Sequence, residues 1–232
     1  MNNFQKAGGI SALIDAGTFI VGLALYFTLL APFLNITGDA QFYRYLAFLV
    51  ENQTLMVAWN LIIYVGFGSC LVVLSLALLH RLSPGAPALA QTAAAFGIIW
   101  AGLVIGAGMI TVVGLESLGA MLVRDPAQAA TIWRAVDTVH TGLGGGIEIV
   151  GGMWVLLVSV AALRSGTLPR LLNYLGLVLG VAGLLTIIRS LEMMGAIFGL
   201  GLIVWFIWTG IVLLRRPVYV VARVETLQAA TS

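Results

Sequence analysis

The chain has 232 residues, of which 61% are hydrophobic and only 9% are charged, and it carries a net charge of +2. Soluble domains contain about 25% charged residues, so this composition excludes an ordinary soluble globule and indicates that much of the surface faces lipid. The positive charge is too small and too dispersed for a nucleic-acid surface, and the single cysteine, Cys70, excludes an intrachain disulfide and a thiolate metal site.

Long apolar segments predict an all-α polytopic membrane protein. They are much longer than the roughly 10-residue alternating strands of a membrane barrel, and a backbone in lipid must satisfy its own hydrogen bonds, which helices do. We therefore expect a six-transmembrane-helix bundle that forms one domain over residues 1–216, followed by a short tail at 217–232. In chain order, the expected helices cover about residues 10–33, 54–79, 88–122, 126–163, 171–188 and 194–214.

Proline-containing turns mark several boundaries between these segments. Pro84 and Pro87 end one helix and start the next, and Asp125-Pro126 is typical of a helix start, with Asp as the N-cap and Pro at the first helical position. The third and fourth segments both exceed the ~20 residues that cross a bilayer. We expect them to form a helical hairpin that extends outside the membrane.

The distribution of basic residues predicts the orientation. Six segments place both termini on one side of the membrane, and basic residues are more frequent on the cytoplasmic side. The terminal side carries Lys6, Arg81, Arg164, Arg170, Arg215, Arg216 and Arg223, and the opposite side carries Arg44, Arg124, Arg134 and Arg189. This excess predicts that the N- and C-termini are cytoplasmic. The partner expected first for such a chain is the lipid bilayer itself.

The main candidate site lies in the stretch DTVHTGLGGGIEIVGG, residues 137–152. Glu148 lies about 24 Å from the turn at Arg164 if the segment is one continuous helix, and a carboxylate at membrane depth is a functional-site hypothesis by default. On such a helix His140 and Glu148 share one face, with Asp137 next to it. The spacing predicts a polar, glycine-lined stripe.

Counting residues along the other helices in the same way places further polar residues at a similar depth, in the outer half of the membrane. They are Asn60, Glu116 and Arg189. We expect an outward-facing polar pocket that narrows to Glu148, where His140 relays protons and Arg189 supplies a counter-charge. The alternative is structural: Glu148 ties its helix to a neighbour, and the glycines serve packing. The candidate residues for ligand or proton binding are Glu148, His140, Asp137, Glu116, Arg189 and Asn60. No catalytic residue, metal ligand or cofactor is predicted.

Other small and aromatic residues have structural interpretations. Trp59, Trp133 and Trp205 are expected to act as anchors at the membrane interface. GxxxG spacings allow close helix packing, either within the bundle or against a second copy or another membrane protein. These pairs are Gly102/Gly106, Gly176/Gly180 and Gly195/Gly199.

Several local stretches resemble a bacterial family of multipass membrane proteins, domain-of-unknown-function family 4386. The resembling stretches are Lys6-Ala7-Gly8-Gly9, Gly38-Asp39-Ala40, Leu163-Arg164-Ser165-Gly166-Thr167-Leu168-Pro169-Arg170, Tyr174-Leu175-Gly176 and Gly180-Val181-Ala182-Gly183. The resemblance covers most of the chain and implies a six- or seven-helix protein of the bacterial cytoplasmic membrane. It implies no activity and no site residues.

Three classes of function remain open. The sequence contains no GxSxG, HExxH, Walker A or CxxC motif, so enzyme chemistry has little support. The leading hypothesis is a non-enzymatic, membrane-embedded binding or accessory protein. The second is a proton- or cation-coupled transporter of a small solute that uses Glu148 and His140. The third is an intramembrane enzyme or cofactor carrier.

Overall fold

The computed structural model describes residues 3–33, 36, 38–191 and 193–215, except for the side chain of Arg189. Every regular element in these ranges is helical. The α-helices are α1 (Asn3–Leu25), α2 (Asp39–Glu51), α3 (Gln53–Asn60), α4 (Phe67–Leu82), α5 (Pro87–Arg124), α6 (Pro126–His140), α7 (Ile149–Ser165), α8 (Arg170–Leu185) and α9 (Met193–Arg215). Short π-helical turns at Tyr26–Leu30, Leu61–Gly66 and Thr141–Gly145 and 3-10 turns at Ala31–Phe33 and Arg189–Leu191 connect or extend them.

Five of these helical segments are long and apolar enough to cross a membrane. They are Asn3–Phe33, Gln53–Leu82, Pro87–Arg124, Pro126–Ser165 and Met193–Arg215. The sixth apolar helix, α8, has 16 residues and is therefore about 24 Å long, shorter than a ~30 Å hydrocarbon core. The expected all-α polytopic membrane protein is confirmed, while the count of six spanning helices stays a prediction.

The region between the first two spans differs from expectation. The sequence predicts a polar connection over residues 35–53, but the structure contains α2 there. This helix buries Leu46 and Leu49 and exposes Arg44 and Glu51, so its apolar residues lie on one face, as in an amphipathic helix.

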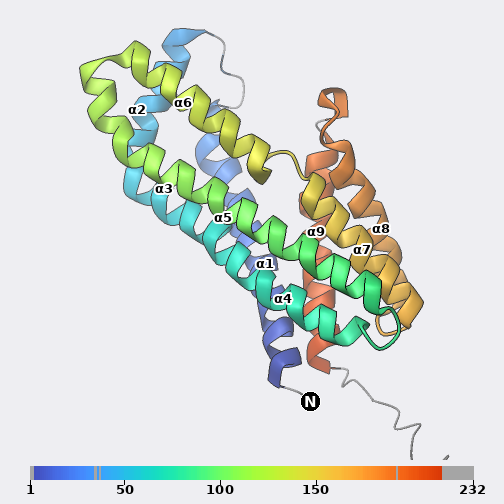
Figure 1. Ribbon diagram of the computed structural model, residues 1–232. Helices are drawn as coiled ribbons and strands as arrows, with labels where there is room; N and C mark the ends of the chain where they lie inside the picture. Colours follow the sequence, from blue (N-terminus) through green and yellow to red (C-terminus); the bar gives the residue numbers. More distant parts are fainter. Residues whose placement is uncertain (1–2, 34–35, 37, 192, 216–232) are drawn as a thin grey trace, which may run out of the picture.

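The buried apolar side chains form two separate clusters. The larger one, which we call the lower core, joins α1, α4, α7, α8 and α9 with the first half of α5, and it contains Trp100, Trp154 and Phe206. The smaller one, the upper core, joins α2, α3 and α6 with the far part of α5, around Leu118 and Trp133. Figure 1 shows why there are two: the upper parts of α5 and α6 lean away from α7, α8 and α9.

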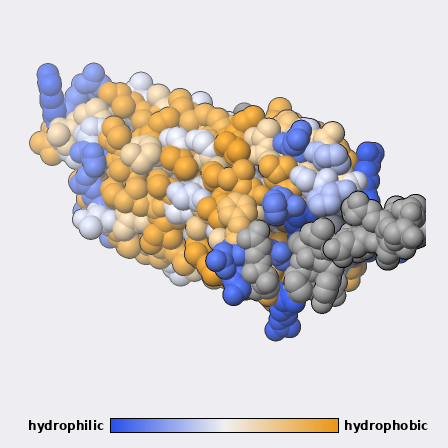
Figure 2. Space-filling model, turned by 60° about the horizontal axis from the view of Figure 1, so that its bottom comes forward, coloured by the Kyte–Doolittle hydropathy of each residue, from blue (hydrophilic) through white to orange (hydrophobic). Residues whose placement is uncertain are grey.

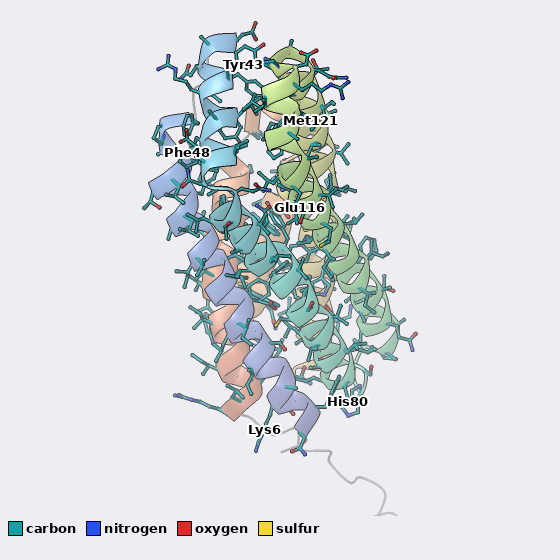
Figure 3. The ribbon with its side chains drawn as sticks, turned by 90° about the vertical axis from the view of Figure 1, so that its left-hand side faces the viewer. Lys6, Tyr43, Phe48, His80, Glu116 and Met121 are labelled. Carbon is teal, nitrogen blue, oxygen red and sulfur yellow. The ribbon has the colours of Figure 1, made fainter. Side chains whose placement is uncertain are left out.

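Both described ends of the chain lie at the lower end of the bundle. The Gln5 side-chain amide donates a hydrogen bond to the carbonyl of Leu213 (2.9 Å), which joins α1 to α9. The guanidinium of Arg81 donates to the carbonyl of Thr167 (3.0 Å), which joins the α4–α5 turn to the α7–α8 turn. In Figure 3, Lys6 and His80 lie at this end, whereas Tyr43 and Met121 lie near the other.

The surface of the molecule fits a lipid environment. Figure 2 shows apolar side chains over the middle of one face, with hydrophilic side chains gathered toward its ends. Large apolar residues are also exposed along α8, where Leu171, Val178 and Val181 are at least half exposed. Exposed apolar area of this extent is typical of helices that contact lipid.

Candidate functional site

The segment expected as one continuous helix over residues 126–163 is broken in the structure. α6 ends at His140, a π-helical turn follows, and α7 begins only at Ile149. Gly144 has φ 117°, a value that favours glycine, and the Ile147 N–H donates to the carbonyl of Thr141 across the break (3.3 Å). Several glycines occur within five residues here, and each weakens a helix by about 1 kcal/mol relative to alanine. The helix propensity of this stretch is therefore low, which favours a break at this point.

Glu148 lies at the start of α7, and its backbone is tied to α8. Its N–H donates to the hydroxyl of Thr186 (2.8 Å), which in turn donates to the carbonyl of Gly183 (2.7 Å) at the end of α8. The Glu148 carbonyl accepts a hydrogen bond from the N–H of Gly152 (2.8 Å), the first bond of α7. The break thus has a defined geometry, held by a neighbouring helix.

A cavity of about 570 Å³ lies beside this break, between the lower and upper cores. Its walls include Phe67 and Trp100 from the lower core, Met56 and Trp59 from the upper core, and the broken backbone at Gly144–Gly146. Non-helical backbone at membrane depth is tolerated where it is buried in protein or lines a cavity. The volume falls within the roughly 300–1,000 Å³ range of small-molecule sites.

Four of the six residues predicted from the sequence line this cavity: Glu148, His140, Asp137 and Asn60. The His140 ring meets the ring of Tyr64 edge-on, with 5.1 Å between ring centroids. Asn60 is buried, and its side-chain amide donates to the carbonyl of Met56 (2.8 Å). The break means that these residues do not form the continuous helical stripe that the spacing predicts, although they still meet around one space.

Asp137 is exposed and lies where this cavity adjoins a second one of about 300 Å³. The second cavity is also lined by Arg134, whose guanidinium forms an ion pair with Asp39 (3.0 Å) and lies 4.5 Å from the centre of the Phe42 ring. These contacts hold α6 against α2. The two cavities share Tyr26, Leu30, Tyr45, Trp133 and Asp137.

The remaining two predicted residues are not brought into this cavity. Glu116 is exposed on α5 and does not belong to the described lining; Figure 3 places it below Met121, in the upper part of the molecule. Arg189 begins the 3-10 turn Arg189–Leu191, and its side chain lies outside the described part of the chain. Its role as a counter-charge stays a prediction.

The tryptophans correct another expectation. Trp59, Trp133 and Trp205 are 8%, 6% and 1% exposed, so they pack inside the protein and do not anchor it at the membrane interface. Trp59 and Trp133 line the cavity. Sequence position near a segment end does not reveal that the upper core continues beyond the expected span and covers these rings.

Three residues of the cavity wall each have a buried ring nitrogen without a hydrogen-bond partner among the described residues: Nε1 of Trp59, Nε1 of Trp100 and Nε2 of His140. The Trp100 N–H lies within range of the Glu148 carboxyl, but its hydrogen-bond geometry is not met. A buried polar group without a partner costs about 1–3 kcal/mol. The site thus holds polar groups that contribute nothing to the stability of the fold.

Tyr45 of α2 contacts the same region from outside the spanning segments. Burial, and to a smaller extent the negative charge of Asp137, raise the pKa of its phenol to about 12, although a hydrogen bond with Trp133 acts in the opposite direction. The phenol therefore stays protonated at physiological pH, and any pH dependence of the site between pH 5 and 9 has another source.

A family model described as "Domain of unknown function (DUF4386)" matches residues 12–216. The chain belongs to the DUF4386 family. The resemblance predicted from the sequence is thereby confirmed, and the DUF4386 match includes the α6–α7 break and nearly all of α1 through α9. No curated protein and no solved structure matches the chain.

Proposed function

We propose that this DUF4386 protein is a non-enzymatic, membrane-embedded binding protein that holds a small molecule in the cavity at the α6–α7 break. The observation that carries the proposal is the coincidence of the broken helix, the cavity and four polar side chains, Glu148, His140, Asp137 and Asn60, in its wall. Apolar walls with a few convergent polar groups are typical of ligand sites.

The orientation predicted from the basic residues gives the cavity a direction. With cytoplasmic termini in a bacterial cytoplasmic membrane, the upper core and the exposed Asp137 face the outer side. A ligand would then enter from outside or from the outer leaflet and pass Asp137 before reaching Glu148.

Native mass spectrometry of protein released gently from its own membrane tests the binding role. Two leucine substitutions form a matched pair: Gly199 lines the cavity, whereas a side chain at Gly102 meets nothing within 4 Å. We expect the wild type and Gly102→Leu to carry a bound small molecule and Gly199→Leu to lose it. A wild type of bare monomer mass, or retention of the molecule by Gly199→Leu, would contradict the proposal.

Transport is the second candidate, because secondary transporters often bind their substrates at discontinuous transmembrane helices. The break between α6 and α7 has this form, and Glu148 and His140 flank it. In proteoliposomes a proton- or cation-coupled flux should disappear in Glu148→Gln and persist in Glu116→Gln, with the folded yield of both unchanged. An unchanged flux in Glu148→Gln removes this carboxylate from any transport mechanism.

An accessory role, in which a helix face with a GxxxG pair binds another membrane protein, is supported by fewer observations. Gly176 and Gly180 pack inside the bundle against α7, where Gly180 approaches the backbone of Gly152. Gly102 and Gly106 of α5 meet no other side chain or helix within 4 Å. Of these two pairs, the α5 pair is therefore the surface left for contact with lipid or another membrane protein.

A further inference from the structure

Fixed charge in the described lining of the larger cavity has one sign. Among the residues that the structure describes, this lining contains two carboxylic acids, Asp137 and Glu148, and no lysine or arginine, although the chain has more basic than acidic residues. The guanidinium of Arg134 belongs to the adjoining second cavity and is paired with Asp39. Such a lining repels an anionic ligand and favours a cationic one.

The walls are also unusually aromatic. Ten of the 32 lining residues are Phe, Tyr or Trp, whereas these residues make up 9% of the whole chain. They come from both cores, and Trp59, Trp100 and Trp133 contribute the largest rings. The face of an aromatic ring attracts a cation, and aromatic cages are a common means of binding quaternary ammonium groups.

The two acids lie on opposite sides of the helix break. Asp137 is exposed and borders the second cavity, whereas Glu148 follows the break beside the buried indole of Trp100. An ionised carboxylate at membrane depth needs a positive partner, and the side chains that the structure describes in this lining include no Lys or Arg. The unpartnered Trp100 N–H can donate to that carboxylate once it is ionised.

From these observations we infer that the ligand is an organic cation with an apolar body, bound with its charge near Glu148 and its apolar groups against the aromatic walls. The inference rests on the proposed binding function and names the chemical class of its ligand. Amphipathic amines, quaternary ammonium ions and phosphonium ions belong to this class.

Two ions of nearly the same shape and opposite charge provide the test: tetraphenylphosphonium and tetraphenylborate. Their equilibrium binding is measured with the full-length protein in lipid nanodiscs, and binding to nanodiscs without protein is subtracted. We expect saturable binding of the phosphonium, at least about 10-fold tighter than any binding of the borate. Equal or tighter binding of the borate would overturn the cationic class while leaving the binding function intact.

Charge-removing variants locate the binding. Glu148→Gln should weaken phosphonium binding by about 10-fold or more, because one charge-assisted contact is lost, whereas Glu116→Gln should bind as the wild type does. If Glu148→Gln folds poorly, judged by its melting temperature, Asp137→Asn at the exposed mouth serves as the second variant, with an expected loss of about 3-fold or more. Wild-type affinity in the folded variants of both acids would overturn the inference.

Absence of saturable binding of either ion would also overturn the cationic class. The proposed function is judged separately by the native mass spectrum of the wild type and of Gly199→Leu. If the bound molecule in that spectrum is neutral or anionic, the cavity is still a binding site, but the inference that its ligand is a cation is wrong.

Discussion

Single residues decide the shape of the site. Gly144 combines a positive φ of 117° with a place in the cavity wall, and the His140 ring occupies the position that a side chain at Gly145 would need. Neither position tolerates a Cβ without strain or movement. The glycine cluster therefore acts through backbone geometry more than through helix packing.

Alanine substitutions separate these effects. Gly144→Ala should lower the free energy of unfolding by about 1–3 kcal/mol, because the new side chain disfavours the local φ. Gly142 has no positive φ, and a Cβ there meets nothing within 4 Å, so Gly142→Ala should be neutral or stabilising by up to about 1 kcal/mol. Unfolding in SDS, followed by tryptophan fluorescence, measures both. Equal stability of the two variants would show that the break is not held by Gly144.

Pairs of helices hold the break in place. α7 packs closely on α8: a Cβ on Gly152 would lie 2.7 Å from the carbonyl oxygen of Gly180 and 2.8 Å from the backbone nitrogen of Leu184. This approach, together with the hydrogen bond from Glu148 to Thr186, fixes the start of α7 against the end of α8. Glycine is needed at the contact because backbone atoms, which cannot rotate away, form the other side.

Gly152→Ala should therefore destabilise the protein by about 1–3 kcal/mol through overpacking of α7 against α8. Gly102→Ala provides the control, since it adds the same methyl group to a helix position with nothing within 4 Å. We expect the control to have wild-type stability or slightly more. Thermal unfolding in detergent compares them, and a Gly152→Ala variant as stable as the control would refute the close α7–α8 contact.

At the scale of the whole molecule, the cavity exists because two cores meet imperfectly. α5 contributes to both cores, and the remaining helices divide between them. The upper core and the described ends of the chain lie toward opposite ends of the bundle, as Figure 3 shows for Met121 and Lys6. Access to the site thus depends on which end faces the cytoplasm.

Cysteine labelling in intact cells decides the orientation. In a Cys70→Ser background, a cysteine at Arg44 should react with an impermeant maleimide added outside, because Arg44 is exposed on α2. A cysteine at His80, which is exposed at the opposite end, should react only after permeabilisation. The reverse pattern would show that the cavity opens toward the cytoplasm.

Local chemistry made much of the fold predictable. The apolar spans follow from composition, and the start of α6 follows from Asp125, whose carboxylate accepts a hydrogen bond from the N–H of Gln128 (3.0 Å) as an N-cap does. We did not predict α2, although its apolar residues recur on one helical face, because its polar residues between two long apolar runs indicated a connection. The helix break was missed for a related reason, since long apolar runs dominate the pattern around four glycines.

The site was predictable to the extent that it is local. His140 and Glu148 lie close along the chain, so both line the cavity even though the helix between them is broken. Counting residues gives depth but not the side of the helix, which is why Asn60 lines the cavity and Glu116 does not. The aromatic walls depend on packing between distant segments, and no local signal distinguishes Trp100 from an ordinary core residue.

The pairing of α1 with α9 has a consequence for synthesis of the protein. Helix α1 packs on α9, which is made much later: the Gly9 and Gly210 backbones approach closely, and the Gln5 side-chain amide donates to the carbonyl of Leu213. Asp15 of α1 is fully buried in the finished bundle, and its carboxyl oxygens have no hydrogen-bond partner in the part of the chain that the structure describes. A nascent chain must therefore hold α1 and its buried Asp15 without the α9 half of their packing until α9 has been made, and truncation before α9 should leave a substrate for quality-control proteases.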